Sequence, residues 1–360
     1  MSEVSSREQR ILGIIETARS KPARFRDERV TMAHGAGGKA TQTMIEGLFV
    51  PAFGAGLAPL ADAALLGVGD EQIALTTDAF VVKPLRFPGG SIGELAVNGT
   101  VNDLSVAGAR PLALSVALVL EEGLEAEALR REVDAIARAA EEAGVRVVAG
   151  DTKVVERGHA DGMYVCTTGV GRRDPRAALA PDAIRPGDRI LVSRSIGEHG
   201  TAIMLARGEL GLESSVESDT RPLWPAVDAL LEAAGPAVRC LRDATRGGVA
   251  SVLNELARAS AVAMVVREGD VPVVPEVAGA AELLGIDPMY VANEGAMVAF
   301  VAPEAAPAAL EALRAAPGGE RAAEIGEVRT EPPGMVLVET AFGGRRVMDQ
   351  LVGDPLPRIC

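Results

Sequence analysis

Apolar and polar positions alternate along residues 30–173 in the way expected for interleaved strands and helices. Short apolar runs bounded by turn residues indicate strands, and longer segments with apolar residues three or four apart indicate helices. This order is typical of a layered α/β domain. The predicted strands are residues 73–77, 111–120, 145–149 and 163–170, and the predicted helices are residues 91–107 and 124–143.

A second alternating pattern follows a junction at residues 181–188, which contains Pro186 and Gly187. We therefore expect two α/β or α+β domains in tandem, without a residue-level repeat. In the second half the predicted strands are residues 189–192 and 297–301, and the predicted helices are residues 222–234, 248–259 and 304–315. The expected divisions are an N-terminal extension (1–29), an N-terminal domain (30–175), a C-terminal α+β domain (185–340) and a C-terminal segment (341–360).

Composition and charge exclude some classes of protein. The 360 residues suffice for two cores, which must be built from aliphatic side chains because hydrophobic residues make up 48% and aromatic residues only 3%. The formal net charge of −14 argues against a nucleic-acid partner, since no basic stripe would neutralise phosphates. No apolar leader and no run of membrane-spanning length is visible, so we expect a soluble cytoplasmic protein.

Three cysteines occur, and their spacing fits neither a metal site nor a disulfide framework. Cys166 and Cys240 lie in apolar segments and are expected to be small core residues. Cys360 is the last residue and follows Pro355 and Pro357, which stiffen an extended tail. Such a tail suits a group carried between sites, although a frayed terminus ending in cysteine is the alternative.

Glycines and a lysine form the first candidate site, in the segment His34-Gly35-Ala36-Gly37-Gly38-Lys39 before a predicted helix. Backbone N–H groups at glycines can approach an anion, and Lys39 adds a charge for phosphate. The spacing is not that of a Walker A loop. Taken alone, such a segment is more commonly a flexible loop.

Several aspartates flank apolar segments and form the second candidate site. Each by itself fits a helix cap or a turn, but converging carboxylates could hold Mg²⁺ against nucleotide phosphates. The segment after Asp243 adds possible phosphate donors in Thr245, Arg246 and Gly247 at a helix start. The candidate carboxylates are Asp70, Asp78, Asp103 and Asp243.

Two further segments offer catalytic side chains. Asp151, Thr152 and Lys153 follow a predicted strand, and Lys153 could stabilise a phosphoryl group or simply pair with Asp151 on the surface. Glu294, in Asn-Glu-Gly at 293–295, could be a general base if its surroundings raise its pKa; a turn acid is the alternative.

Together these segments resemble the HypE family of hydrogenase maturation factors from about residue 30 to the end of the chain. The family belongs to a superfamily of ATP-using enzymes that includes aminoimidazole ribotide synthetase, selenophosphate synthetase and thiamine monophosphate kinase. The glycine segment lacks the reactive residue of selenophosphate synthetases, which favours HypE. The matching segments are HGAGGK at 34–39, TTD at 76–78, ND at 102–103, GDTK at 150–153, DATRGG at 243–248, NEG at 293–295 and PRIC at 357–360.

The resemblance implies a two-domain aminoimidazole-ribotide-synthetase-like fold, with N-terminal domains pairing into a β-barrel in a homodimer. It also implies that the carbamoyltransferase HypF loads the Cys360 thiol with a carbamoyl group. ATP would then dehydrate this thiocarboxamide to a thiocyanate, and the cyanide would pass to iron on the HypC–HypD complex for a nickel–iron hydrogenase. No nucleic acid or membrane partner is implied.

The resemblance assigns roles to the candidate residues. Asp78, Asp103 and Asp243 would hold Mg²⁺, with Asp70 as a further candidate. The expected catalytic residues are Cys360, Glu294 and Lys153. The residues expected to contact ATP are Gly35, Gly37, Gly38, Lys39, Asp151, Thr152, Thr245, Arg246 and Gly247.

Two rival hypotheses remain open on the sequence. A relative within the superfamily could use ATP on a small free substrate, and a non-catalytic scaffold could use the terminal cysteine to bind iron or dock a partner.

Overall fold

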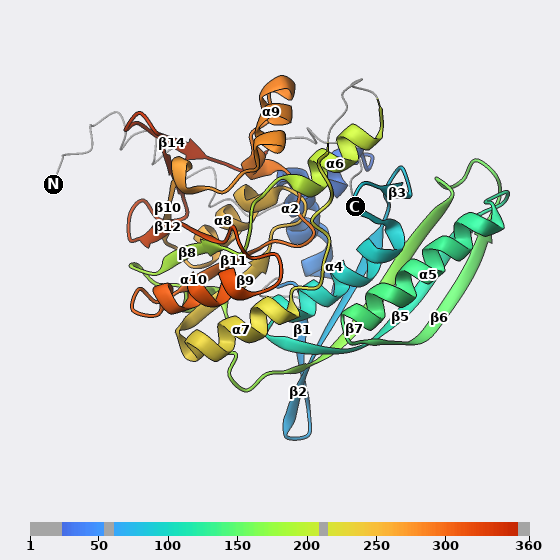
Figure 1. Ribbon diagram of the computed structural model, residues 1–360, viewed down its shortest axis with the longest axis horizontal. Helices are drawn as coiled ribbons and strands as arrows, with labels where there is room; N and C mark the ends of the chain where they lie inside the picture. Colours follow the sequence, from blue (N-terminus) through green and yellow to red (C-terminus); the bar gives the residue numbers. More distant parts are fainter. Residues whose placement is uncertain (1–23, 54–60, 209–214, 352–360) are drawn as a thin grey trace. The chain divides into compact units, whose positions relative to one another are not determined.

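The computed structural model describes residues 24–53, 61–208 and 215–351. The chain forms two compact units, one of residues 1–60 with 351–354 and the other of residues 61–350 with 355–360 (Figure 1). Residues 1–23 of the N-terminal extension and the tail ending in Cys360 lie outside the described residues.

The smaller unit contains the glycine segment. A 3₁₀ turn, η1 (Met32–Gly35), precedes α2 (Lys39–Met44), a π-helical segment η2 (Ile45–Phe49) and α3 (Val50–Phe53). His34 is buried, and its Nδ1 accepts a hydrogen bond of 3.0 Å from the Thr31 N–H. Gly37 turns the chain into α2 with φ of +74°, a conformation that costs glycine little.

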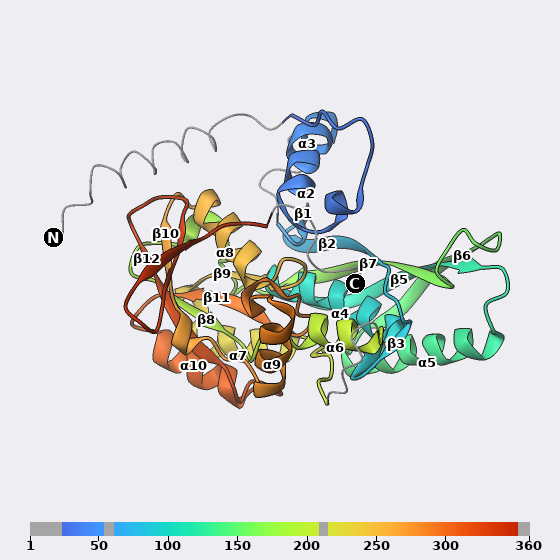
Figure 2. The ribbon, with the colours of Figure 1, turned by 90° about the horizontal axis from the view of Figure 1, so that it is seen from above.

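The larger unit begins with a five-stranded mixed sheet in the order β1-β2-β7-β5-β6. The β5–β6 pair is parallel and the other pairs are antiparallel. Two helices, α4 (Ile92–Val106) and α5 (Ala126–Glu142), run along one face (Figures 1 and 2). The strands are β1 (Ala64–Val68), β2 (Glu71–Phe80), β5 (Ala109–Glu121), β6 (Arg146–Val155) and β7 (Met163–Arg173), and the short pair β3 (Arg86–Phe87) and β4 (Gly90–Ser91) precedes α4.

Helix α4 is the most buried helix of this half because both of its sides are covered. It packs on β2, β5 and β7 and also contacts β9 and α7 of the second half. Gly99 permits this close packing, since a Cβ there would lie 2.7 Å from the Phe80 ring. Large apolar side chains of this sheet remain exposed, among them Leu65, Leu66, Leu75, Leu112, Val147, Val148 and Val154.

A seven-stranded sheet in the order β14-β13-β10-β12-β8-β11-β9 forms the second half. Its strands are β8 (Arg189–Val192), β9 (Val238–Asp243), β10 (Ala263–Arg267), β11 (Met297–Val301), β12 (Ala323–Arg329), β13 (Val336–Glu339) and β14 (Arg345–Met348). Its helices are α6 (Glu198–Ala206), α7 (Trp224–Ala234), α8 (Gly248–Ala259), α9 (Pro275–Leu284) and α10 (Ala306–Ala315), with 3₁₀ turns η4 (Pro181–Ala183), η5 (Gly235–Ala237), η6 (Glu268–Asp270) and η7 (Pro288–Tyr290).

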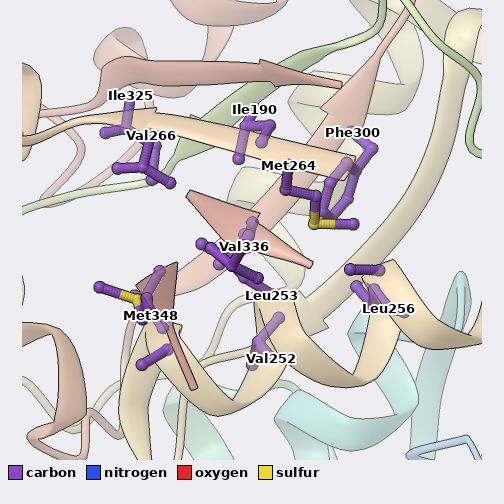
Figure 3. Close-up of a cluster of buried hydrophobic side chains, with 14 of the residues drawn as sticks. Ile190, Val252, Leu253, Leu256, Met264, Val266, Phe300, Ile325, Val336 and Met348 are labelled. Carbon is purple, nitrogen blue, oxygen red and sulfur yellow. The ribbon is translucent and has the colours of Figure 1, made fainter. Parts of the chain in front are cut away.

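Strand β11 is buried on both faces, which explains its unbroken apolar sequence. Val298 and Phe300 join the cluster that includes Leu253 and Leu256 of α8 (Figure 3). Met297, Ala299 and Val301 join a second cluster with α7 and α10. The sheet is therefore covered by helices on both faces, as Figure 2 shows.

The main elements predicted from the pattern are confirmed, and β8, α8 and β11 have the predicted bounds. One placement was wrong: residues 150–153 do not follow a strand but lie within β6, because the parallel pairing with β5 continues to Val155. Strands β10, β12, β13 and β14 were not predicted. Among the described residues, no helix combines the length and the apolar character needed to cross a membrane.

Candidate active site

Three carboxylates from different parts of the larger unit meet where its two halves pack together. Asp62 precedes β1, Asp103 lies on α4, and Asp243 ends β9. One oxygen of each lies within 4.8 Å of the others. Two of these residues were predicted from the sequence, and Asp62 was not.

Hydrogen bonds fix the orientation of this acidic cluster, by which we mean Asp62, Asp103 and Asp243. Thr76 Oγ1 lies 2.7 Å from Asp103 Oδ2 and 2.8 Å from the carbonyl oxygen of Asp62, so its proton is available to both. Arg242 Nη1 donates to Asp62 Oδ1 over 2.6 Å. The cluster is thus attached to β2 and β9 as well as to α4.

Asp78 lies beside the cluster on β2. Its Oδ2 accepts a hydrogen bond of 2.9 Å from the Thr100 hydroxyl of α4. Burial raises the pKa of Asp78, whereas the Thr100 hydrogen bond and the charge of Arg246 lower it. The Thr100 hydroxyl and Arg246 therefore offset part of the cost of burying the Asp78 carboxylate.

Burial and mutual repulsion make the negative charges of the cluster costly. Burial, and then the charge of Asp78, raise the pKa of Asp103 well above its ordinary value. Burial and the charge of Asp62 do the same to the pKa of Asp243. For Asp62 burial also raises the pKa, but Arg242 opposes the shift. Like charges so close together cannot all ionise without a cation.

The donor set fits a hard divalent cation. All the converging groups are carboxylate oxygens, which Mg²⁺ prefers, and sulfur and imidazole are absent from the cluster. A divalent charge would offset the repulsion that raises the pKa values. Asp62, Asp103 and Asp243 are therefore the residues that would hold Mg²⁺, with Asp78 adjacent.

The Asn-Glu-Gly segment lies in a loop before β11, and Asp219 holds its backbone. The Asp219 carboxylate accepts hydrogen bonds from the Glu294 and Gly295 N–H groups over 2.9 and 3.0 Å. A Cβ at Gly295 would lie 2.0 Å from the Asp219 carbonyl oxygen, so only glycine fits. Asp219 was missed because a buried acid that binds backbone has no sequence pattern of its own.

Asn293 connects this loop to two other elements. Its side-chain NH₂ donates to the Ala244 carbonyl oxygen, just after the cluster residue Asp243, over 2.9 Å. Its side-chain oxygen accepts a 2.7 Å hydrogen bond from the Gly197 N–H at the start of α6. Asn293 is thus a structural residue that fixes the loop relative to β9.

The Glu294 side chain is buried beside α4, where a Cβ at Gly99 would lie 3.9 Å from its Oε2. Burial, followed by the charges of Asp219 and Asp243, raises the pKa of Glu294 well above its ordinary value. A carboxylate whose pKa is raised is a stronger base than an exposed carboxylate.

The glycines after Asp243 shape the turn into α8. Gly247 and Gly248 have φ of +81° and +60°. A Cβ on Gly248 would lie 2.5 Å from the Met289 carbonyl oxygen, so this turn passes close to η7. The charge of Arg246 lowers the pKa values of both Asp78 and Glu294, which places a guanidinium near the acidic groups.

Within the larger unit the structure does not bring Asp70, Asp151, Thr152 or Lys153 into this cluster. Asp70 lies in the turn between β1 and β2, separated from Asp62 by the full length of β1. Lys153 forms a 2.6 Å ion pair with Asp151 on the exposed strand β6, and Thr152 is exposed beside them. The predicted ATP-contacting residues Gly35, Gly37, Gly38 and Lys39 belong to the smaller unit.

The two described cysteines differ in exposure. Cys240 is buried in the core, and burial raises the pKa of its thiol to about 12, so it is inert. Cys166 was expected in the core, but β7 turns its side chain to the uncovered face of the sheet and it is exposed.

Two protein-family models match the chain, one for each half of the larger unit. Residues 60–173 match the AIR synthase related protein N-terminal domain, and residues 185–338 match the AIR synthase related protein C-terminal domain. The chain is 51% identical over 340 residues to the carbamoyl dehydratase HypE of Rhodobacter capsulatus, covering 93% of this chain and 99% of the relative. Against the carbamoyl dehydratase HypE of Escherichia coli K12, identity is 42% over 337 residues, covering 92% and 99%.

Solved structures give the same result. A chain in the crystal structure of a HypE–HypF complex matches with a TM-score of 0.81 and 44% identity, covering 86% of this chain and 99% of that one. The crystal structure of hydrogenase maturation protein HypE in complex with ATP matches with a TM-score of 0.78 and 44% identity, covering 92% and 100%.

We predict that Asp103→Asn stabilises the protein at pH 7 in Mg²⁺-free buffer. The raised pKa means that the folded state binds a proton more tightly than the unfolded state, so the charged carboxylate costs stability at neutral pH and less as the pH falls. The amide keeps an acceptor for Thr76 and removes the charge. Urea unfolding should show a gain of about 1 kcal/mol or more.

The gain should shrink at pH 5, and added Mg²⁺ should stabilise the parent more than the variant. Asp134→Asn, an exposed position on α5, is the matched control and should change little. A destabilised Asp103→Asn protein at pH 7 without Mg²⁺ would contradict the electrostatic account.

Proposed function

Because the chain belongs to the HypE family of carbamoyl dehydratases, which serve hydrogenase maturation, we propose that it uses ATP to dehydrate a carbamoyl group carried on Cys360. The product is a thiocyanate, whose cyanide becomes a ligand of the iron in a nickel–iron hydrogenase. The observation that supports this most is the buried Glu294 carboxyl, with its raised pKa, beside a cluster of carboxylates suited to Mg²⁺.

The reaction must remove one oxygen and two protons from the carbamoyl group. The carbamoyl oxygen attacks the γ-phosphorus of ATP, the bond to ADP breaks, and the oxygen becomes part of a phosphate ester. Loss of both nitrogen protons then forms the C≡N bond as the C–O bond breaks and inorganic phosphate leaves. The oxygen thus departs in phosphate, and the sulfur stays bonded to carbon throughout.

The cluster residues Asp62, Asp103 and Asp243 would hold Mg²⁺, with Asp78 beside them. A bound cation would neutralise part of the phosphate charge. Thr76 and Arg242 keep the carboxylates oriented before nucleotide arrives, which limits the reorganisation needed on binding.

Glu294 is the proposed base for the nitrogen protons. Its backbone is fixed by Asp219, while its carboxylate lies near α4 on the side of the acidic cluster. Burial raises its pKa, so the carboxylate accepts a proton more readily than an exposed glutamate at neutral pH. Lys153 is the proposed stabiliser of the transferring phosphoryl group, which requires its surface ion pair with Asp151 to open.

The remaining ATP contacts are proposed from the family motifs. Gly35, Gly37, Gly38 and Lys39 would contact phosphates through backbone N–H groups and a charge. Thr245, Arg246 and Gly247 sit in the turn after Asp243, where a guanidinium already acts on nearby carboxylates. Asp151 and Thr152 would complete the set.

The proposed partners follow from the carrier role of Cys360. HypF would load the thiol, in keeping with the similarity to a chain of a HypE–HypF complex, and HypC–HypD would accept the cyanide. A second copy of this chain would cover the apolar face of the first sheet and close a barrel. Eight or so large aliphatic side chains exposed on one sheet are otherwise costly in water.

We predict that Cys360→Ala prevents loading and therefore all cyanide formation, while the fold and ATP binding persist. Intact-chain mass spectrometry after incubation with HypF, carbamoyl phosphate and ATP should show a carbamoyl group gained and one water then lost in the parent. Cys166→Ala, which removes the exposed thiol of β7, should behave like the parent. Modification of the Cys360→Ala chain would refute the carrier role, and an unmodified parent would favour a scaffold.

We predict that Glu294→Gln accumulates the carbamoylated chain, because the amide cannot accept the nitrogen protons. The dehydration rate should fall by about 10²–10⁴-fold. Glu304→Gln, at an exposed position, is the control. Time-resolved mass spectrometry separates loading from water loss. An unchanged dehydration rate in Glu294→Gln would exclude it as the base.

We predict that Val148→Arg weakens association of two chains, because it places a charge on the exposed apolar strand β6. Sedimentation equilibrium should show at least a tenfold higher dissociation constant, equivalent to about 1.4 kcal/mol. Val133→Arg, on the exposed side of α5, is the matched control. Equal dissociation constants for the two variants would place the interface elsewhere.

A further inference from the structure

A pocket lies in the larger unit, separate from the acidic cluster. Its cavity measures about 430 Å³, and Arg194, Arg221, Ser193 and Thr220 line it together with the turn at residues 317–319. We call it the arginine pocket. Gly295 forms part of its wall, so the loop that directs Glu294 toward α4 separates the two sites.

Arg221 is a partly buried cation without a carboxylate partner. Within the described part of the chain no acidic oxygen lies within 4.0 Å of its guanidinium, and its Nη1 donates a hydrogen bond to the Pro317 carbonyl oxygen over 3.3 Å. Its Nε is buried and has no acceptor. Burial, followed by the charge of Arg194, lowers the pKa of Arg221, so the neighbouring guanidinium adds to the cost.

Arg194 presents a second guanidinium to the same cavity. Its Nη2 donates to Glu198 Oε1 over 3.1 Å and its Nη1 to the Asp219 carbonyl oxygen over 3.4 Å. Its Nε, like that of Arg221, is buried without a partner. These contacts hold Arg194 in place and leave two guanidinium groups facing one cavity.

The charge balance of the lining favours an anion. Among the described residues that line the cavity two are arginines and one, Glu142, is a carboxylate, while Glu198 pairs with Arg194 from outside the lining. Hydroxyls of Ser193 and Thr220 add hydrogen-bond donors, and Leu223 and the prolines at 222 and 225 supply an apolar wall. Guanidinium groups recognise phosphate and carboxylate through paired N–H donors.

We propose that the arginine pocket binds a small anionic ligand through a phosphate or carboxylate group, with Arg221 as the main contact. The cavity volume lies within the range of small-molecule sites, about 300–1,000 Å³. The charges of Asp219, Glu320 and Glu198 act on Arg221 from beyond hydrogen-bond distance, and the anion would add a direct partner for its guanidinium while the apolar wall covers the rest of the ligand. This proposal does not depend on the dehydratase mechanism.

The test uses the full chain and two probes, inorganic phosphate and acetate, at constant ionic strength. Isothermal titration calorimetry with Arg221→Gln should show affinity for the bound anion reduced by roughly tenfold or more. Arg130→Gln, at an exposed position on α5, is the matched control and should bind like the parent. Thermal unfolding checks that each variant is folded.

Gly318→Ala provides a second variant that keeps both arginines. A Cβ at Gly318 would lie 1.3 Å from Arg221 Nη1, so the guanidinium must move out of its present position. Anion affinity should fall in this variant too. If Arg221→Gln does not fold, the affinity of Gly318→Ala serves as the test of the proposal.

The two probes identify the chemical group. Phosphate binding that depends on Arg221 indicates a phosphate-bearing ligand, and acetate binding with the same dependence indicates a carboxylate. Anion binding at the acidic cluster or the glycine segment would be unaffected by Arg221→Gln. The proposal is overturned if neither anion binds, or if both bind Arg221→Gln and Arg130→Gln equally.

Discussion

Repulsion among buried carboxylates is the constraint around which the larger unit is organised. Asp62, Asp103 and Asp243 come from separate elements and meet only when α4 packs between the first sheet and β9. Each neighbouring group that offsets their charge also ties two elements together, as Arg242 does for Asp62. A bound cation would offset the free-energy cost of gathering these charges, so that folding and cation binding would be thermodynamically linked.

The neutral side chain of Asn102 connects the two halves of the larger unit through hydrogen bonds. Asn102 of α4 donates to the carbonyl oxygens of Arg221 and Glu294 and accepts from the Leu223 N–H. These bonds join the helix that bears Asp103 to the loop that bears Glu294. Because these hydrogen bonds are buried and fully paired, they fix the relative positions of Asp103 and Glu294 without adding charge.

Sequence patterns predicted the parts of the fold that local forces decide. Helix α8 and strand β11 were placed at their observed bounds because glycine turns and an unbroken apolar run mark them. Among the acids, Asp70 and Asp62 look alike in the sequence, each beside an apolar run, and only the direction of β1 decides that Asp62 joins the cluster. Pairing of distant strands sets that direction, and local sequence does not encode it. The same pairing placed Lys153 within β6.

The loop at residues 293–295 divides structural and chemical duties between adjacent positions. Asn293, Gly295 and the backbone of Glu294 hold the loop, whereas the Glu294 side chain takes no part in these contacts. The side chain at position 294 could therefore be changed with the loop's hydrogen bonds left in place, whereas a change at 293 or 295 would break the contacts that set the path of the backbone.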